Sequence, residues 1–164
     1  MALDLTLRPF CPKDQERMLE LLTDNTVNQT YMLPDFEKKE DAIPLFEKLM
    51  GLSMDEGRFV RCISLEGTAI GFMNDVVVKD SSMELGYVIH PDSQGKGYMT
   101  QALKMAIAEL FEKGFAKVFC GAFEENKASL HVMEKAGMQP MDFTEIIEYR
   151  GKEHLCLYRA ICKE

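Results

Sequence analysis

Residues 92–100 read DSQGKGYMT, and this stretch joins a strand-like run to an amphipathic helix. The glycines at positions 95 and 97 allow a sharp turn, and they let the main chain approach a ligand without an intervening Cβ. The first amides of the following helix have no partner inside the helix and lie at the positive end of its dipole. The stretch therefore predicts either a plain turn or a cradle for an anion such as a pyrophosphate.

The two common nucleotide-binding loops do not fit this stretch. The dinucleotide fingerprint has a third glycine where Thr100 stands. The P-loop ends in Gly-Lys followed by Ser or Thr, whereas Lys96 is followed by Gly97. The stretch instead resembles the acetyl-CoA signature of the GNAT acetyltransferase superfamily, Gln/Arg-x-x-Gly-x-Gly/Ala, which here begins at Gln94 and has Met99 in place of the final Gly or Ala.

The resemblance is densest from Met83 to Met138, and Thr100 to Leu103 also looks like the helix that follows this loop in RimJ/RimL-type members, which modify protein N-termini. It implies an acetyl-CoA-dependent N-acetyltransferase that moves an acetyl group to a primary amine, such as a protein N-terminus. It also implies that acetyl-CoA is held by the glycine stretch, the strand end before it and the start of a later helix. The residues concerned are Val88, Ile89, His90, Gln94, Gly95, Lys96, Gly97, Tyr98, Met99, Thr100 and Asn126.

The composition predicts one globular domain over residues 1–164. Hydrophobic residues make up 46% of the chain and charged residues 28%, which is ordinary for a soluble domain of this length. The net charge of −8 argues against generic binding of nucleic acid or of an anionic membrane. It suits a cationic acceptor such as a basic protein or peptide N-terminus.

The cysteines and the N-terminal residues predict a cytoplasmic protein. The five cysteines are odd in number and widely spaced, with no C-x-x-C pair and only three histidines, so no metal site or disulfide framework is predicted. This usage is typical of a reducing compartment. The first residues lack a basic and apolar leader, and no apolar run approaches the length of a membrane-spanning helix.

Hydrophobic periodicity predicts the element order β-α-α-β-β-β-α-β-α-β-β. This order is that of GNAT proteins, and it indicates an α/β (α+β) fold with a mixed, mostly antiparallel central sheet of about seven strands and about four flanking helices. The last two strands offer an edge for a homodimer. The predicted helices cover 13–24, 38–52, 98–113 and 126–136, and the predicted strands cover 3–8, 59–65, 69–78, 83–90, 117–123 and two C-terminal segments joined around 150–152.

Acetyl transfer to an amine needs a base for the ammonium proton, donors for the developing oxyanion and an acid for the departing thiolate. Alternation along the strand 83–90 puts Glu84, Gly86, Val88 and His90 on one face, although a bulge, which the family often has here, would shift this phase. Glu84 is either a solvated strand residue or the base. By analogy with the family, the main-chain amides of residues 88–90 are the candidate oxyanion donors.

The start of the helix at Asn126 supplies the candidate acid. Asn126 suits an N-cap, which would explain it without a ligand, and the resemblance implies that it lies near the pantetheine arm. RimJ/RimL-type members have a serine three residues later, here Ser129, which implies that Ser129 or a water protonates the thiolate. Many GNAT enzymes use a tyrosine where this chain has Met133. Cys120 would suit a covalent route, but it lies in an apolar run without an adjacent histidine.

The loop between the first two helices is the candidate acceptor site. Asn28, Tyr31 and Met32 in this loop are either ordinary surface residues or part of the substrate pocket. The acidic residues Asp35, Glu37, Asp142 and Glu145 are either solvated or form a rim for a cationic substrate. Two alternatives to a protein acceptor stay open, namely a small amine such as an antibiotic or polyamine, and a non-catalytic acyl-CoA-binding module.

Overall fold

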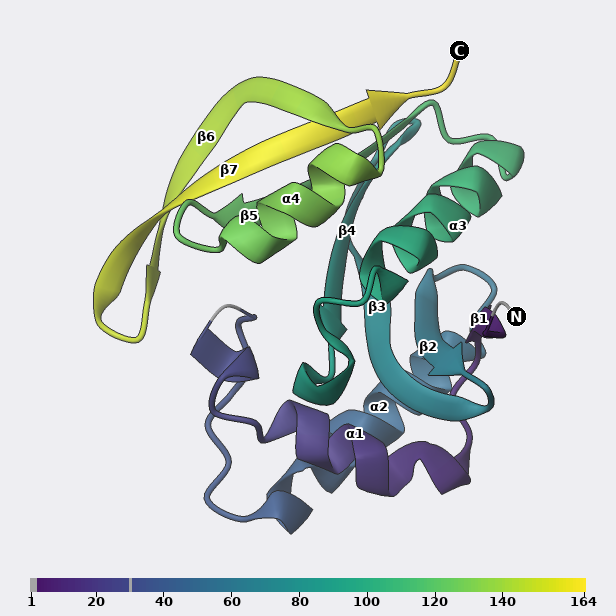
Figure 1. Cartoon of the computed structure of the whole chain (residues 1–164), viewed down its shortest axis with the longest axis vertical. Coiled ribbons are helices and arrows are strands. Elements are labelled where there is room, and N and C mark those ends of the chain that lie inside the picture. The colour runs from purple at the N-terminus through teal and green to yellow at the C-terminus, as the bar shows by residue number, and fades with distance from the viewer. Residues whose placement is uncertain (1–2, 30) are drawn as a thin grey trace. The chain divides into compact units, whose positions relative to one another are not determined.

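The computed structural model describes residues 3–29 and 31–164, and its helices and strands follow the predicted order (Figure 1). The helices are α1 (Gln15–Leu22), α2 (Ile43–Ser53), α3 (Tyr98–Glu112) and α4 (Lys127–Lys135). The strands are β1 (Leu5–Arg8), β2 (Val60–Leu65), β3 (Thr68–Lys79), β4 (Ser82–Ile89), β5 (Lys117–Phe123), β6 (Gln139–Tyr149) and β7 (Lys152–Cys162). Short 3₁₀ turns lie at Pro12–Asp14, Val27–Gln29, Lys39–Ala42 and Pro91–Ser93.

The strands form a seven-stranded sheet in the order β1-β2-β3-β4-β5-β7-β6. The neighbours β1 and β2, β2 and β3, β5 and β7, and β6 and β7 are antiparallel. β4 and β5 are parallel, and Ser82–Glu84 is paired with Lys117–Phe119. The predicted α/β fold with a mixed, mostly antiparallel sheet and four helices is therefore confirmed.

The described chain falls into two compact units whose boundaries pass through β3 and β4. Unit 1 comprises residues 1–74 and 87–98, and unit 2 comprises residues 75–86 and 99–164. The prediction of one domain over the whole chain stays a prediction. Within residues 3–29 and 31–164, no helix is both long and apolar enough to cross a membrane.

Unit 1 has its core between its two helices and strands β2 and β3. Figure 1 shows α1 and α2 running side by side, and the two helices contact each other. The Phe10 ring meets Phe46 of α2 edge-on, with 5.9 Å between ring centroids, and it also meets Phe72 of β3. The predicted helix 38–52 starts instead with the 3₁₀ turn Lys39–Ala42, and α2 then has Pro44 in its first turn, where a missing amide costs nothing.

Gly71, inside β3, allows close contact with the end of β4. A Cβ at Gly71 would lie 2.3 Å from the main-chain oxygen of Val88, so no other residue fits without a shift of the backbone. Val88 and Ile89 are both buried, so strict alternation of buried and exposed residues ends at this point of β4. The strand end is therefore fixed by main-chain packing as well as by the sheet.

Unit 2 contains α3, α4 and the antiparallel strands β5, β7 and β6. The long hairpin of β6 and β7 extends beyond α4 in Figure 1. Phe123, Cys156 and Tyr158 form a buried cluster here, and Phe119 and Tyr149 are among the half-buried residues packed against it. One face of this part of the sheet is thus rich in aromatic side chains.

Candidate active site

The glycine stretch forms an exposed loop directly before α3. Gly95 and Gly97 have φ angles of +74° and +83°, in the left-handed region that side-chain-bearing residues rarely adopt. A Cβ at either position would meet no atom within 4 Å, so the conformation of the chain, not crowding, requires glycine here. The open space beside both glycines leaves the main chain accessible to a ligand.

The main-chain amides of this loop fit an anionic group. In the part of the chain that the structure describes, the amides of Gly95, Lys96 and Gly97 donate no hydrogen bond to protein. Tyr98 then begins the 15-residue helix α3, whose first amides also lack helical partners. Unpaired amides at the start of a helix are the usual protein donors to phosphate groups, so the loop fits the pyrophosphate of acetyl-CoA.

The side chains around the loop hold its own main chain. Gln94 Nε2 donates to the Ile89 oxygen at 3.3 Å, and Lys96 Nζ donates to the Asp92 oxygen at 3.2 Å. Met99, which replaces the small residue of the signature, is only 6% exposed. The Met99 side chain thus points into the protein, while Tyr98 and Thr100 are half-buried in the first turn of α3.

Arg17 of α1 ties the chain before the loop to the sheet. Its guanidinium donates two hydrogen bonds to the Asp92 carboxylate, at 3.0 and 3.2 Å, and Arg17 Nε donates to the Ala69 oxygen at 3.1 Å. The hydrogen bonds from Arg17 lower the pKa of Asp92 to about 2. No local sequence pattern predicts the role of Arg17, because its partner Asp92 is 75 residues away.

His90 has a structural role in this fold. Its main-chain amide donates to the Ile70 oxygen at 2.6 Å, so this amide is not free for an oxyanion, and the prediction for this residue is wrong in that respect. Its ring lies between two carboxylates, with Nδ1 2.9 Å from Asp92 Oδ1 and Nε2 3.6 Å from Glu20 Oε2. Val88 and Ile89 remain as candidate donors in the predicted segment.

Glu84 lies on β4 in unit 2 and is paired with Phe119 of β5. Its side chain is half-buried, and burial raises the pKa of its carboxyl. The Glu145 carboxylate of β6 raises the pKa of Glu84 further, because two like charges disfavour each other. Glu84 is thus a carboxylate whose proton affinity is increased, as a base for an ammonium group requires.

Tyr158, which no sequence pattern predicted, is influenced by the charges of both carboxylates. A Cβ at Gly121 would lie 2.6 Å from the ring carbon Cε1 of Tyr158, so the ring lies over that glycine. Burial raises the pKa of Tyr158, and the side-chain hydrogen bond to Cys156 and the charges of Glu84 and Glu145 add to this. The hydroxyl is therefore neutral. An isolated glycine inside a strand, such as Gly121, is a sequence signal of such close packing.

The start of α4 is capped as predicted. Asn126 is the N-cap residue, and its Oδ1 accepts a hydrogen bond from the Ser129 amide at 3.2 Å. The cap accounts for Asn126 without a ligand and fixes the first turn, where Ser129 is half-buried. Met133, at the position of the family's tyrosine, is fully buried and belongs to the core.

Cys120 does not have the properties of a nucleophile. It is fully buried in β5, and burial raises the pKa of its thiol. A reactive cysteine needs a lowered pKa so that the thiolate forms. Within residues 3–29 and 31–164, no group of three or more histidine, cysteine or acidic side chains is placed to hold a metal ion.

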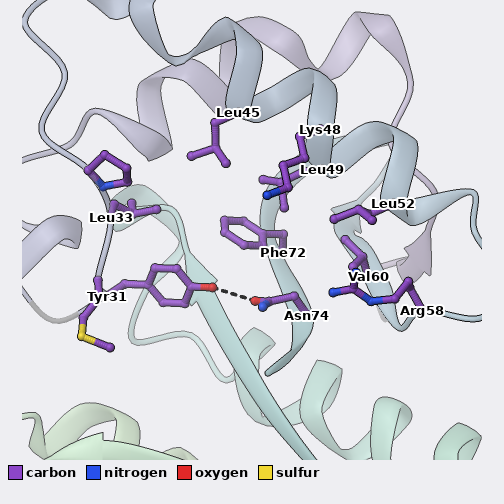
Figure 2. Close-up of a pocket in the computed structure, with 12 residues that line it drawn as sticks. Tyr31, Leu33, Leu45, Lys48, Leu49, Leu52, Arg58, Val60, Phe72 and Asn74 are labelled. Atoms are coloured by element: carbon purple, nitrogen blue, oxygen red, sulfur yellow. Dashed lines mark hydrogen bonds between the residues drawn. The ribbon is translucent and has the colours of Figure 1, made fainter. Parts of the chain in front are cut away.

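A cavity of about 300 Å³ lies wholly in unit 1 (Figure 2). It is lined by the loop segment 31–34, by α2, by Arg58 and Val60, and by Phe72 and Asn74 of β3. Tyr31 and Met32, predicted as substrate residues, are part of this lining, whereas Asn28 lies in the 3₁₀ turn Val27–Gln29 outside it. We call this cavity the unit 1 pocket.

The polar wall of the unit 1 pocket is a hydrogen-bonded pair. The Tyr31 hydroxyl donates to Asn74 Oδ1 at 2.6 Å (Figure 2), and burial raises the pKa of Tyr31. The Tyr31 ring packs edge-on against Phe72, with 5.6 Å between centroids. Apart from Tyr31 and Met32, no local pattern predicted the lining, because the other lining residues come from the loop, α2, Arg58, β2 and β3 without a shared motif.

The chain is similar to characterised and uncharacterised acetyltransferases. It shares 28% identity with the uncharacterized N-acetyltransferase YnaD of Bacillus subtilis, over 91% of this chain and 87% of YnaD. The structure of the microcin C7 self immunity acetyltransferase MccE, with acetyl-CoA and AMP, matches with a TM-score of 0.84 at 19% identity, over 98% of this chain and 93% of MccE. RimL, a ribosomal L7/L12 alpha-N-protein acetyltransferase with coenzyme A, matches with a TM-score of 0.84 at 18% identity, over 96% and 93% of the two chains.

These solved structures are too distant in sequence to show more than the fold. The family comparison reaches further, because the family described as "Acetyltransferase (GNAT) domain" matches residues 4–139, most of the chain. The mixed seven-stranded sheet, the glycine loop before α3 and the family match all indicate the same family. The chain belongs to the GNAT acetyltransferase family and is an acetyl-CoA-dependent N-acetyltransferase.

Proposed function

We propose that this enzyme transfers the acetyl group of acetyl-CoA directly to a primary amine, without a covalent enzyme intermediate. The observation that carries the proposal is the exposed loop before α3, with two left-handed glycines and three amides that donate to no described residue. These features support binding of the pyrophosphate at Gly95, Lys96 and Gly97, with Gln94 and the first turn of α3 beside it. The buried Cys120 thiol disfavours a covalent route.

The reaction needs three proton movements when the acceptor arrives as an ammonium ion. The base first removes one proton to give the free amine. The free amine then attacks the thioester carbonyl carbon, a C–N bond forms, and the C–S bond breaks. A second proton leaves the nitrogen, the coenzyme A thiolate takes up one proton to become the thiol, and one proton is released to solvent. The products are an amide and coenzyme A, so no oxidant or metal is required for balance.

We assign the base role to Glu84. Its raised pKa supports this assignment, because a carboxylate with increased proton affinity accepts a proton from an ammonium group more readily, either directly or through water. The amides of Val88 and Ile89 are the proposed donors to the thioester oxygen. His90 is left out of this role because its amide is already bonded to Ile70.

We assign the acid role to Ser129 or to a water held near it. The capping hydrogen bond from the Ser129 amide to Asn126 Oδ1 supports a fixed position for Ser129 in the first turn of α4. Asn126 keeps its side-chain NH₂ group as a donor for the pantetheine arm. The burial of Met133 supports a mechanism without the tyrosine that many family members use.

The acceptor is a primary amine, and two classes have support. A protein N-terminus is the RimJ/RimL-like candidate, and RimL, a ribosomal L7/L12 alpha-N-protein acetyltransferase, shares the fold. A small amine is favoured by the unit 1 pocket, whose volume of about 300 Å³ suits a small molecule. The net charge of −8 supports a cationic group on the acceptor. A cytoplasmic location and a homodimer that forms through β6 also stay parts of the proposal.

The experiment that tests the proposal is acetyl-CoA binding by calorimetry, followed by thiol release over a panel of amines. Gly97→Ala should weaken binding, because alanine at a φ of +83° is strained. Gly67→Ala is the matched control, since Gly67 has a φ of +82° in the turn between β2 and β3. Absence of acetyl-CoA binding by the wild type would remove the proposal, and binding without thiol release would leave an acyl-CoA-binding module.

A further inference from the structure

The unit 1 pocket has an apolar floor. Phe72 and Val60 are at most 2% exposed, and Leu49 of α2 is 8% exposed. These side chains pack in the core of unit 1, so the floor exists before any ligand binds. A preformed apolar cavity of about 300 Å³ is at the lower end of the 300–1,000 Å³ range typical of small-molecule sites.

The charged residues of this pocket are both cationic. Lys48 of α2 and Arg58 line it, and in Figure 2 both side chains point into the ring of lining residues. No carboxylate belongs to the lining among the residues that the structure describes. The lining itself thus carries basic groups and no acidic one, in a chain of net charge −8.

Lys48 is available to a ligand. Within the described residues its ammonium group forms no hydrogen bond or ion pair, and the side chain is exposed at the mouth of the pocket. The Tyr31 hydroxyl is neutral because burial raises its pKa, so the opposite wall adds no negative charge. A carboxylate at the mouth would gain a charge-assisted hydrogen bond from Lys48, while its apolar body rests on Phe72 and Leu49.

We infer that the unit 1 pocket binds an apolar side chain together with a carboxylate of the same molecule, and that the acceptor is a small amine carrying both groups, such as a free apolar amino acid. This inference rests on the proposed acetyl transfer to an amine. It narrows that proposal, because a peptide N-terminus has no carboxylate next to its amine.

Substrate pairs that differ only in the carboxylate test the inference. Phenylalanine and leucine are compared with phenylalaninamide and leucinamide as acceptors, with kcat/KM measured at one pH. The acids should be preferred by at least about tenfold, the effect of one hydrogen bond between charged groups. A difference in amine basicity cannot produce this result. The amino acid amides have more acidic ammonium groups than the amino acids, so at the same pH more of each amide is free amine, which would favour the amides.

A binding measurement separates the pocket from the reaction. 3-Phenylpropionate and 3-phenylpropionamide carry no amine, and their affinities are measured by calorimetry. The wild type should bind the acid at least about tenfold more tightly. Lys48→Met should remove that difference, and Lys39→Met, which alters an exposed lysine outside the pocket lining, should retain it. Leu52→Trp, at a half-buried lining position, should fill the pocket and abolish binding of both probes while thermal unfolding confirms a folded protein.

The outcomes of the two measurements are distinct. Turnover of other amines with no preference for the acids, and no difference between the two probes, would overturn the pocket inference and leave acetyl transfer intact. Selective binding of phenylpropionate that depends on Lys48, without turnover of any amine, would support the pocket and remove the proposed function. Equal binding of both probes in wild type and Lys48→Met would overturn the role of the carboxylate.

Discussion

Two carboxylates, one in each unit, have opposite surroundings. Asp92 of unit 1 accepts two hydrogen bonds from Arg17, which lower its pKa to about 2. Glu84 of unit 2 is half-buried near a second carboxylate, Glu145, and its pKa is raised. A carboxylate paired with a guanidinium stays charged and positions the chain, whereas one that is partly desolvated beside a like charge takes up a proton more readily. These surroundings support a positioning role for Asp92 and the proposed base role for Glu84.

The largest expected effect comes from removing the proposed base. Glu84→Gln should lower kcat/KM by about 10²–10⁴-fold, because an amide cannot accept the ammonium proton. The affinity for acetyl-CoA, measured by calorimetry, should stay unchanged. Glu153→Gln, an exposed change on β7, is the control and should retain activity. If Glu84→Gln retained the kcat/KM of the wild type, Glu84 would not be the base. The proposed difference in role between Glu84 and Asp92 would then be wrong.

The position of the main chain in unit 1, where Asp92 lies, depends first on main-chain packing. Gly71→Ala should destabilise the protein by about 1–3 kcal/mol, as expected for overpacking, because the new Cβ would lie 2.3 Å from the Val88 oxygen. Urea unfolding measures the loss, and acetyl-CoA affinity should fall with it. Gly51→Ala in α2 meets no atom within 4 Å and should instead stabilise by about 0.5–1 kcal/mol. Equal stability of the two variants would contradict the close approach.

The ion pair of Arg17 with Asp92 should have a smaller effect. Arg17→Lys replaces a two-pronged donor by a point charge and should weaken acetyl-CoA binding by at most about fivefold, since an exposed ion pair contributes about 0.2–1 kcal/mol. The value of kcat at saturating acetyl-CoA should not change. Arg159→Lys in unit 2 is the control. A lowered kcat with normal affinity would place Arg17 in the chemistry.

The pH dependence of that ion pair follows from the lowered pKa of Asp92. A carboxyl group whose pKa is lowered on folding stabilises the folded state above its ordinary pKa, near 4, and the stabilisation is lost as the pH falls toward 2. The difference in stability between wild type and Arg17→Lys should therefore be present at neutral pH and shrink on acidification. Thermal unfolding at a series of pH values measures this.

Local patterns predicted the fold, the turn at the glycine loop and the cap at the start of α4. Alternation and turn residues placed all seven strands, and the N-cap at Asn126 and the glycines at 95 and 97 were readable because each depends on its neighbours in sequence. The positive φ angles of both glycines agree with the residue type. These parts of the molecule are determined by a few adjacent residues.

Contacts between distant segments were not readable in this way. The bond from the His90 amide to Ile70 and the pair of Arg17 with Asp92 depend on how strands and helices pack, so no local pattern contained them. The unit 1 pocket combines residues from a loop, a helix and two strands for the same reason. Gly71 and Gly121 carried a signal, because a glycine inside an apolar strand indicates close approach of another group.

The smallest expected effect is a shift in the pH profile of kcat/KM that results from the charge interaction between Glu84 and Glu145. The active form of the base is the ionised one, and a raised pKa places the acidic limb of the rate profile above the ordinary range of glutamate. Glu145→Gln removes the like charge, so Glu84 should ionise at lower pH and the acidic limb of kcat/KM should move to lower pH. The control Glu153→Gln should leave the limb in place.

The acceptor amine also titrates, and the two contributions can be separated. A limb that belongs to the amine moves when the acceptor is replaced by one of different basicity and does not respond to Glu145→Gln. A limb that belongs to Glu84 moves with Glu145→Gln for every acceptor and disappears in Glu84→Gln. An acidic limb that depends only on the acceptor would mean that the amine reaches the enzyme already deprotonated. The raised pKa of Glu84 would then reflect its burial and not its use as a base.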